Sequence, residues 1–154
     1  ICPAAEKDAL AAALTAAGVA EADLEAANVV RIENGKPRYG DDISERFLAQ
    51  ETNEMRALHF SKGCYLGQEI VERVRSRAQI HRRLMPVQLE TDQPPAAGSK
   101  LQAGGKDAAE ITSAAYSPAL GKTVALAYVR IDLKPGDAVT LGDVQGVVRA
   151  PRAQ

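Results

Sequence analysis

The stretch that decides the fold reads EITSAAYS at residues 110–117, PALG at residues 118–121 and TVALAYVR at residues 123–130. The outer two segments are rich in residues that favour strands, whereas the central segment carries Pro and Gly, which favour a turn. We therefore predict two strands joined by a short connection. These are the two clearest strand signals in the chain.

Further strand signals lie on both sides of this pair, in shorter segments bounded by Gly- or Pro-containing turns. They comprise residues 84–90, 101–102, 138–141 and 144–149. Gly104-Gly105 and Gly142-Asp143 are typical of tight hairpin turns. Several short strands at this spacing predict a small antiparallel barrel or sandwich that begins near residue 80.

The residues before this region have a helical character instead. Residues 5–17 predict an alanine-rich helix that stops at Gly18, and a second helix is predicted from Glu21 to about Ile32. Residues 43–61 lack clear periodicity and are interpreted as a loop with short helical pieces. The predicted fold class is therefore α+β, with helices and loops followed by a small antiparallel β-barrel.

An eight-residue motif, KGCYLGQE at residues 62–69, precedes a third predicted helix that ends near Arg77. Apolar residues recur there every four positions and predict one face of that helix. These residues are Leu66, Ile70, Val74 and Ala78.

Cys64 is the candidate nucleophile of this motif. It is expected at or just before a helix N-terminus, where unpaired N–H groups and the helix dipole favour an anion. Lys62 adds a positive charge two residues away, so we predict a partly accessible thiolate with Cys64 and Lys62 as candidate catalytic residues. The alternative is that Cys64 is a small buried hydrophobic residue.

Composition narrows the possible functions. The chain has 154 residues, of which 45% are hydrophobic and 25% charged, as in globular proteins. Its net charge of −1 and aromatic content of 4% argue against direct nucleic-acid binding. No apolar run has the length of a membrane span. The two cysteines do not form a disulfide framework, which predicts a reducing, cytoplasmic compartment. The spacing of the histidines and Cys64 predicts no metal site.

Three separated blocks resemble one protein superfamily, in the expected order. The blocks at residues 31–42 (RIENGKPRYGDD) and 110–129 resemble folate-dependent aminomethyltransferases and the YgfZ family, their folate-binding relatives. The motif at residues 62–69 resembles the signature of the YgfZ family alone. The resemblance implies that residues 1–79 are the C-terminal part of a folate-binding region and that residues 80–154 are the C-terminal barrel. A missing N-terminal half of the same protein is then an expected partner.

The same resemblance implies a set of ligand contacts. Glu33 is expected to contact the pterin of tetrahydrofolate, since a carboxylate accepts two parallel N–H bonds well. The alternative is that Glu33 merely neutralises Arg31 or caps local backbone. Further candidates for folate binding are Tyr65, Gln68 and Arg75. For Arg75, a solvated helix face is the alternative.

Three functions remain open from the sequence. The YgfZ resemblance implies a folate-binding accessory factor that maintains iron–sulfur enzymes, including those of tRNA modification, with iron–sulfur enzymes or assembly factors as partners. The alternative is a tetrahydrofolate-dependent aminomethyltransferase like the glycine cleavage T-protein. The third possibility is an interaction module in which folate plays no part.

Overall fold

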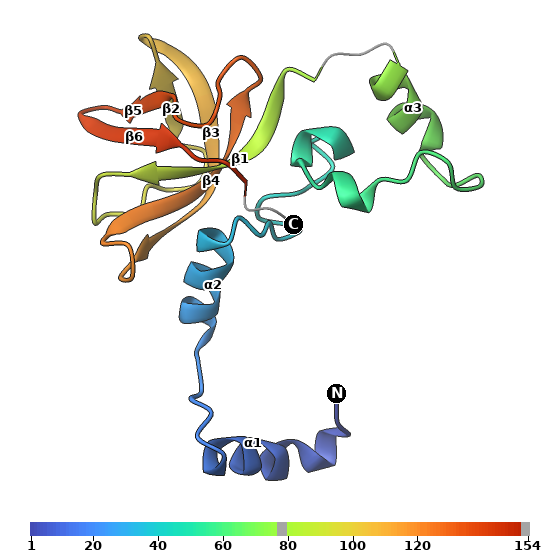
Figure 1. The fold of residues 1–154 in the computed structure, drawn as a ribbon, viewed down its shortest axis with the longest axis vertical. Coiled ribbons are helices and arrows are strands. Elements are labelled where there is room, and N and C mark those ends of the chain that lie inside the picture. The colour runs from blue at the N-terminus through green and yellow to red at the C-terminus, as the bar shows by residue number, and fades with distance from the viewer. Residues whose placement is uncertain (77–79, 152–154) are drawn as a thin grey trace.

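The computed structural model describes residues 1–76 and 80–151. The helices are α1 (Lys7–Ala16), α2 (Leu24–Glu33) and α3 (Gln68–Ser76), with 3-10 helices η1 (Ala4–Glu6), η2 (Ala49–Thr52) and η3 (Met55–Ala57). The strands are β1 (Arg82–Leu89), β2 (Lys100–Ala103), β3 (Lys106–Ser117), β4 (Lys122–Arg130), β5 (Ala138–Leu141) and β6 (Val144–Val148). Figure 1 shows the strands gathered into one body, with α2 leading up to it and α3 beside it.

The six strands form a closed barrel in the order β1-β4-β3-β2-β5-β6, and β6 pairs with β1 to complete the ring. Every neighbouring pair is antiparallel. The barrel predicted from the short, evenly spaced strands is therefore confirmed. Strand β3 starts at Lys106, four residues before the predicted strand, because the turn at Gly104-Gly105 continues directly into pairing with β2.

Strand β4 is buried on both of its faces, which explains its almost continuous apolar sequence. Alternate residues point to opposite sides of a strand. Ala125, Ala127 and Val129 contribute to the core inside the barrel. Leu126 and Tyr128 belong to a second core outside it, where Ile32 of α2 packs against the strands. The outer core therefore attaches α2 to the barrel.

Helix α2 begins at Leu24, three residues after the predicted start. Asp23 caps the helix rather than lying in its first turn, since its carboxylate accepts a hydrogen bond from the Ala26 N–H at 2.7 Å. At the other end, Gly35 adopts a φ of +65°, which is the left-handed conformation expected just after a helix. The Lys36 N–H then donates to the Arg31 carbonyl at 2.8 Å and closes the last turn.

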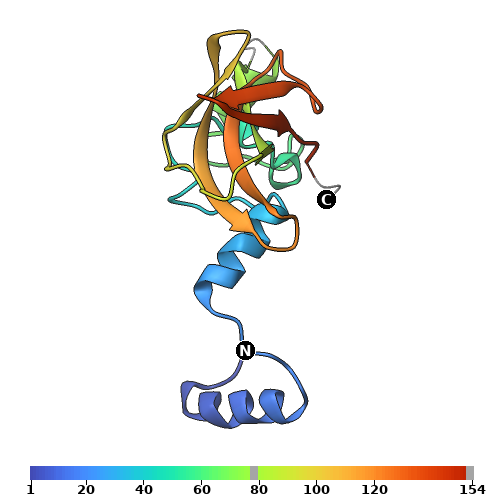
Figure 2. The ribbon, with the colours of Figure 1, turned by 90° about the vertical axis from the view of Figure 1, so that its left-hand side faces the viewer.

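Helix α1 matches the predicted helix and ends before Gly18, whose φ is +81°. It contains no buried residue, and Leu10 and Leu14 on its predicted apolar face are about half exposed. Figures 1 and 2 both show α1 standing away from the barrel. None of the helices in the described ranges combines the length and hydropathy needed to cross a membrane.

The buried face of α3 differs from the prediction. Leu66 precedes the helix and is fully exposed, and Ile70 is 59% exposed, whereas Val71 and Val74 are buried. A strict spacing of four residues drifts around a helix of 3.6 residues per turn, so the predicted stripe does not stay on one face. Ala78 and Arg77 of that prediction lie outside the described residues.

Candidate functional site

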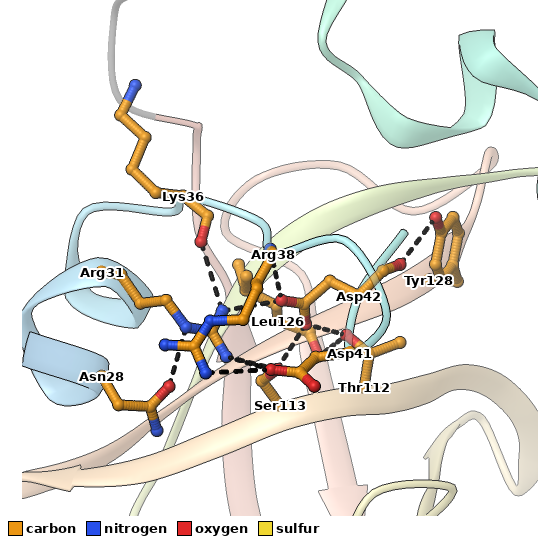
Figure 3. A network of polar contacts seen from close by, with 10 residues as sticks. All are labelled: Asn28, Arg31, Lys36, Arg38, Asp41, Asp42, Thr112, Ser113, Leu126 and Tyr128. Atoms are coloured by element: carbon orange, nitrogen blue, oxygen red, sulfur yellow. Dashed lines mark hydrogen bonds and ion pairs between the residues drawn. The ribbon is translucent and has the colours of Figure 1, made fainter. Parts of the chain in front are cut away.

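A fully buried carboxylate, that of Asp42, lies at the centre of a network of polar contacts (Figure 3). Arg31 Nη1 donates to Asp42 Oδ2 at 2.7 Å, and the Arg38 N–H donates to the same oxygen at 3.0 Å. The hydroxyls of Thr112 and Ser113 both donate to Asp42 Oδ1, each at 2.5 Å. Asp42 is therefore paired with one cation and hydrogen-bonded on both oxygens, which is what a buried charge requires.

A β-bulge in β3 makes this double contact possible. Neighbouring side chains of a regular strand point to opposite faces. Here the register shifts: Ile111 lies opposite Ala127 and Ser113 lies opposite Leu126, so Thr112 is the extra residue. The irregularity allows two consecutive hydroxyls to reach one carboxylate oxygen.

Arg31 binds several acceptors besides Asp42. Its Nε donates to Asn28 Oδ1 at 2.7 Å, and its Nη2 donates to Ser113 Oγ at 3.0 Å. A weaker contact joins Nη2 to Asp41 Oδ2 at 3.4 Å. Glu33 is absent from the described partners of Arg31, so the Arg31 charge is balanced by the two aspartates. The alternative role of Glu33 as the partner of Arg31 is therefore not the arrangement in this structure.

Tyr128 completes the network from β4. Its hydroxyl donates to the Asp42 backbone carbonyl at 3.1 Å. Burial, reinforced by the Glu51 carboxylate, raises the pKa of Tyr128 well above its usual value, so the phenol stays a donor. The Tyr128 ring stacks on Phe47 with centroids 3.6 Å apart. Helix α2, the following loop and two strands are thus joined around Asp42.

Glu33 lies in a different environment. It is half-buried and lines a cavity of about 220 Å³ between the end of α2, β1, β4 and the segment after β6. Pro86, Gln88 and Arg149 also line this cavity. Within residues 1–76 and 80–151, the Glu33 side chain has no hydrogen-bond or ion-pair partner. A half-enclosed carboxylate without a partner is available for a ligand with N–H donors.

The motif at residues 62–69 lies elsewhere. Cys64 is exposed, and α3 begins four residues after it, at Gln68. The Gly67 carbonyl accepts hydrogen bonds from the Ile70 and Val71 N–H groups, so Gly67 directly precedes the first turn of the helix and Cys64 lies three residues further upstream. The Lys62 ammonium lies 4.3 Å from the centroid of the Tyr65 ring.

The other residues predicted to bind folate lie in two different places. Tyr65 and Gln68 line a concavity of about 540 Å³ at the start of α3. Arg75 lies over the Phe60 ring, 4.6 Å from its centroid, and pairs with Glu72 at 3.5 Å. None of these residues lines the Glu33 cavity. The structure thus brings Lys62 and Tyr65 together but leaves Glu33 apart, and the assigned roles of all these residues stay predictions.

Sequence reasoning assigned no role to Asp42, Thr112 or Ser113, although all three lie inside the blocks quoted above. The signal that could have found them is the combination of a cation, a carboxylate and two adjacent hydroxyls in blocks separated by about 70 residues. Within the described parts of the chain, no three His, Cys, Asp or Glu side chains gather into a group that could hold a metal ion.

Comparison with known proteins identifies the barrel. Residues 82–151 match the family described as the glycine cleavage T-protein C-terminal barrel domain. The barrel is of the T-protein type. A crystal structure of the glycine cleavage system aminomethyltransferase T from Bartonella henselae has the same fold, with a TM-score of 0.79 and 24% sequence identity over 94% of this chain and 43% of that chain.

Curated relatives extend the similarity beyond the T-protein-type barrel. An aminomethyltransferase of Streptomyces coelicolor is 35% identical over 126 residues, which are 79% of this chain and 33% of the relative. One of Rubrobacter xylanophilus is 32% identical over 138 residues, covering 89% and 37% respectively. The chain thus spans about a third of the length of these relatives.

Proposed function

We propose that this chain contributes the Glu33 contact to a tetrahydrofolate site in a protein of the aminomethyltransferase type. The observation that carries the proposal is Glu33, a residue that lines a cavity and whose carboxylate has no polar partner in the described parts of the chain. The similarity to aminomethyltransferases supports the folate class of ligand. Bound tetrahydrofolate would supply the nitrogen atoms that accept a one-carbon unit.

The size of the cavity is consistent with binding of the pterin ring of tetrahydrofolate. Its volume of about 220 Å³ is below the range of about 300–1,000 Å³ that is common for whole drug-sized ligands. We infer that only the bicyclic pterin enters it and that the remainder of the folate projects outward. The pterin offers an amino group beside a ring N–H, and a carboxylate accepts such a pair of donors with charge assistance. In this role Glu33 binds and orients the ligand.

Glu33→Gln tests this assignment. The amide keeps the size of the side chain but loses the negative charge and one acceptor, so the pterin donors are desolvated without full compensation. We expect the Kd for tetrahydrofolate to rise by about tenfold to a hundredfold, as for the loss of charged hydrogen bonds. Isothermal calorimetry on the protein expressed from its complete reading frame measures this change.

Glu25→Gln is the matched control for that experiment. Glu25 lies in the first turn of the same helix, is exposed and does not line the Glu33 cavity. The substitution makes the same change of charge, and we expect the Kd to stay within twofold of the wild-type value. Equal Kd values for the wild type and Glu33→Gln would contradict the proposed site.

A second candidate function rests on the exposed thiol in the motif at residues 62–69. Here we propose the YgfZ-type role, in which the protein supports iron–sulfur enzymes and Cys64 is the reactive group. An exposed Cys64 is accessible to a partner protein or a small thiol reagent. Only the second function requires Cys64. Folate binding at Glu33 does not, because no residue of the motif lines the Glu33 cavity.

Cys64→Ala separates the two candidates. Removal of one exposed sulfur atom should change the free energy of unfolding by no more than about 0.5 kcal/mol. The Kd for tetrahydrofolate should stay within twofold of wild type. Under the second candidate, the variant fails to restore iron–sulfur enzyme activity in a deletion strain. Full complementation by Cys64→Ala would leave the aminomethyltransferase-type function as the better account.

A further inference from the structure

The last turn of α2 is held from two sides. Ile32 is buried in the outer core and is only 1% exposed. Arg31 is fixed by the buried Asp42 carboxylate and by Asn28 and Ser113. Gly35, which follows the helix, lies so close to β1 that a Cβ atom there would be 3.3 Å from Pro86 Cγ. The backbone from residue 31 to residue 35 therefore has a defined position on the barrel.

Glu33 has no such support of its own. Its side chain makes no hydrogen bond or ion pair to the parts of the chain that the structure describes. Residues two positions apart on a helix lie on different faces, so Arg31 and Glu33 project in different directions from the same turn. Because Arg31 and Glu33 belong to the same turn, a rotation of that turn would move the Glu33 side chain relative to its cavity, and the hydrogen bonds of Arg31 oppose such a rotation.

We propose that Asp42 is a positioning residue for ligand binding: by holding Arg31, its buried carboxylate fixes the last turn of α2 and aims Glu33 into the cavity. The ligand class follows from the function proposed above, on which this inference rests. Asp42 itself does not line the Glu33 cavity. Its effect on the ligand is transmitted through Arg31 and the helix backbone.

Asp42→Asn is the variant that tests the positioning role. The amide preserves the volume of the buried side chain but weakens its bond to Arg31. We expect the Kd for tetrahydrofolate to rise about tenfold when measured by calorimetry at a temperature where the variant is fully folded. In the free protein, amide hydrogen exchange at Gly35 and Lys36 should be faster by about tenfold, because both amides close the last turn of α2.

Val139→Ala is the control for a merely structural role. Val139 is fully buried inside the barrel, on β5, and does not line the Glu33 cavity. Its truncation lowers the stability by leaving a cavity in the core. We expect it to change neither the Kd nor the relative exchange rates at Gly35 and Lys36. A tenfold rise in Kd in both variants would show that loss of stability alone weakens binding, and would overturn the proposal.

A double-mutant cycle with Glu33→Gln tests whether Asp42 affects the Kd through Glu33. If Asp42 acts through Glu33, Asp42→Asn should change the Kd by less than twofold in the Glu33→Gln background. Additive effects of the two substitutions would overturn the inference. The exchange measurement needs no ligand: unchanged exchange at Gly35 and Lys36 overturns the positioning role even if folate binds. A wild-type protein that does not bind folate contradicts the proposed function instead.

Discussion

Arg31→Met is expected to lower the free energy of unfolding by about 3–5 kcal/mol, because it leaves the Asp42 carboxylate buried without its cation. Asp42 is fully buried and the Arg31 side chain is only 13% exposed, so solvent replaces little of the lost interaction. Methionine keeps much of the length of the arginine chain and limits the loss of packing. Denaturant unfolding followed by circular dichroism measures the change. For a protein of ordinary stability, this loss is a large share of the total.

Arg38→Met is the control for this substitution. The Arg38 side chain pairs with Asp41 at 3.3 Å, but both side chains are about half exposed. Exposed ion pairs contribute about 0–1 kcal/mol, so the variant should remain close to the wild type. The Arg38 backbone N–H, which donates to Asp42, is unaffected by the change. Equal destabilisation by the two substitutions would show that the buried pair has no special importance.

The double variant Arg31→Met, Asp42→Asn tests whether the instability of Arg31→Met comes from the unpaired Asp42 carboxylate. When both charges are removed, no unpaired ion remains buried, and the amide still interacts with the hydroxyls of Thr112 and Ser113. The double variant should therefore be more stable than Arg31→Met alone. If it is less stable by the sum of the two single effects, the cost of Arg31→Met does not come from the unpaired carboxylate.

The barrel could be predicted from the sequence because its signals are local. The alternation at the end of β1, the almost continuous apolar run of β4 and the Gly-containing turns before β3 and β6 are each readable within a few residues. The order of strands around the barrel depends on pairing between distant segments, such as β6 with β1, and no local pattern encodes it. The sequence therefore predicted the class of fold better than its topology.

The errors in the helical region have a physical cause as well. Helix α3 is short, and its apolar residues are distributed around it, so periodicity identified Val74 as a buried residue but missed Val71. Asp23 resembles a first-turn acid in the sequence, but only the geometry shows its carboxylate capping the Ala26 N–H. Boundaries and buried faces of short helices depend on what the helix packs against.

The candidate site was predictable only in part. Glu33 was singled out through a resemblance, and the structure places it in a cavity without a polar partner. The role of Asp42 depends on a bulge at Thr112 that aligns two neighbouring hydroxyls, and no single residue in the sequence indicates this irregularity. A buried polar network is a property of several distant segments at once, which is why local patterns did not reveal it.

Among the glycines of the chain, Gly146 in the middle of β6 has the closest surroundings. It lies opposite Leu89 of β1 in the ladder. A Cβ atom at this position would be 2.5 Å from Leu89 Cδ2, 2.8 Å from the Gln88 carbonyl oxygen and 3.3 Å from Val139 Cγ2. Leu89 and Val139 are fully buried, and the Gln88 oxygen belongs to the backbone, so none of these atoms has room to withdraw. The glycine is required here for space.

Gly146→Ala should therefore lower the free energy of unfolding by about 3 kcal/mol, at the upper end of the cost of overpacking, because a strand of the closed ring has to shift. Thermal and denaturant unfolding measure the loss. Gly63→Ala is the control: no atom lies within 4 Å of a Cβ at Gly63, so the change should stay within about 0.5 kcal/mol. If Gly146→Ala is as stable as Gly63→Ala, β1 and β6 can move apart without cost, and the closure of the barrel at this seam is looser than the contacts around Gly146 indicate.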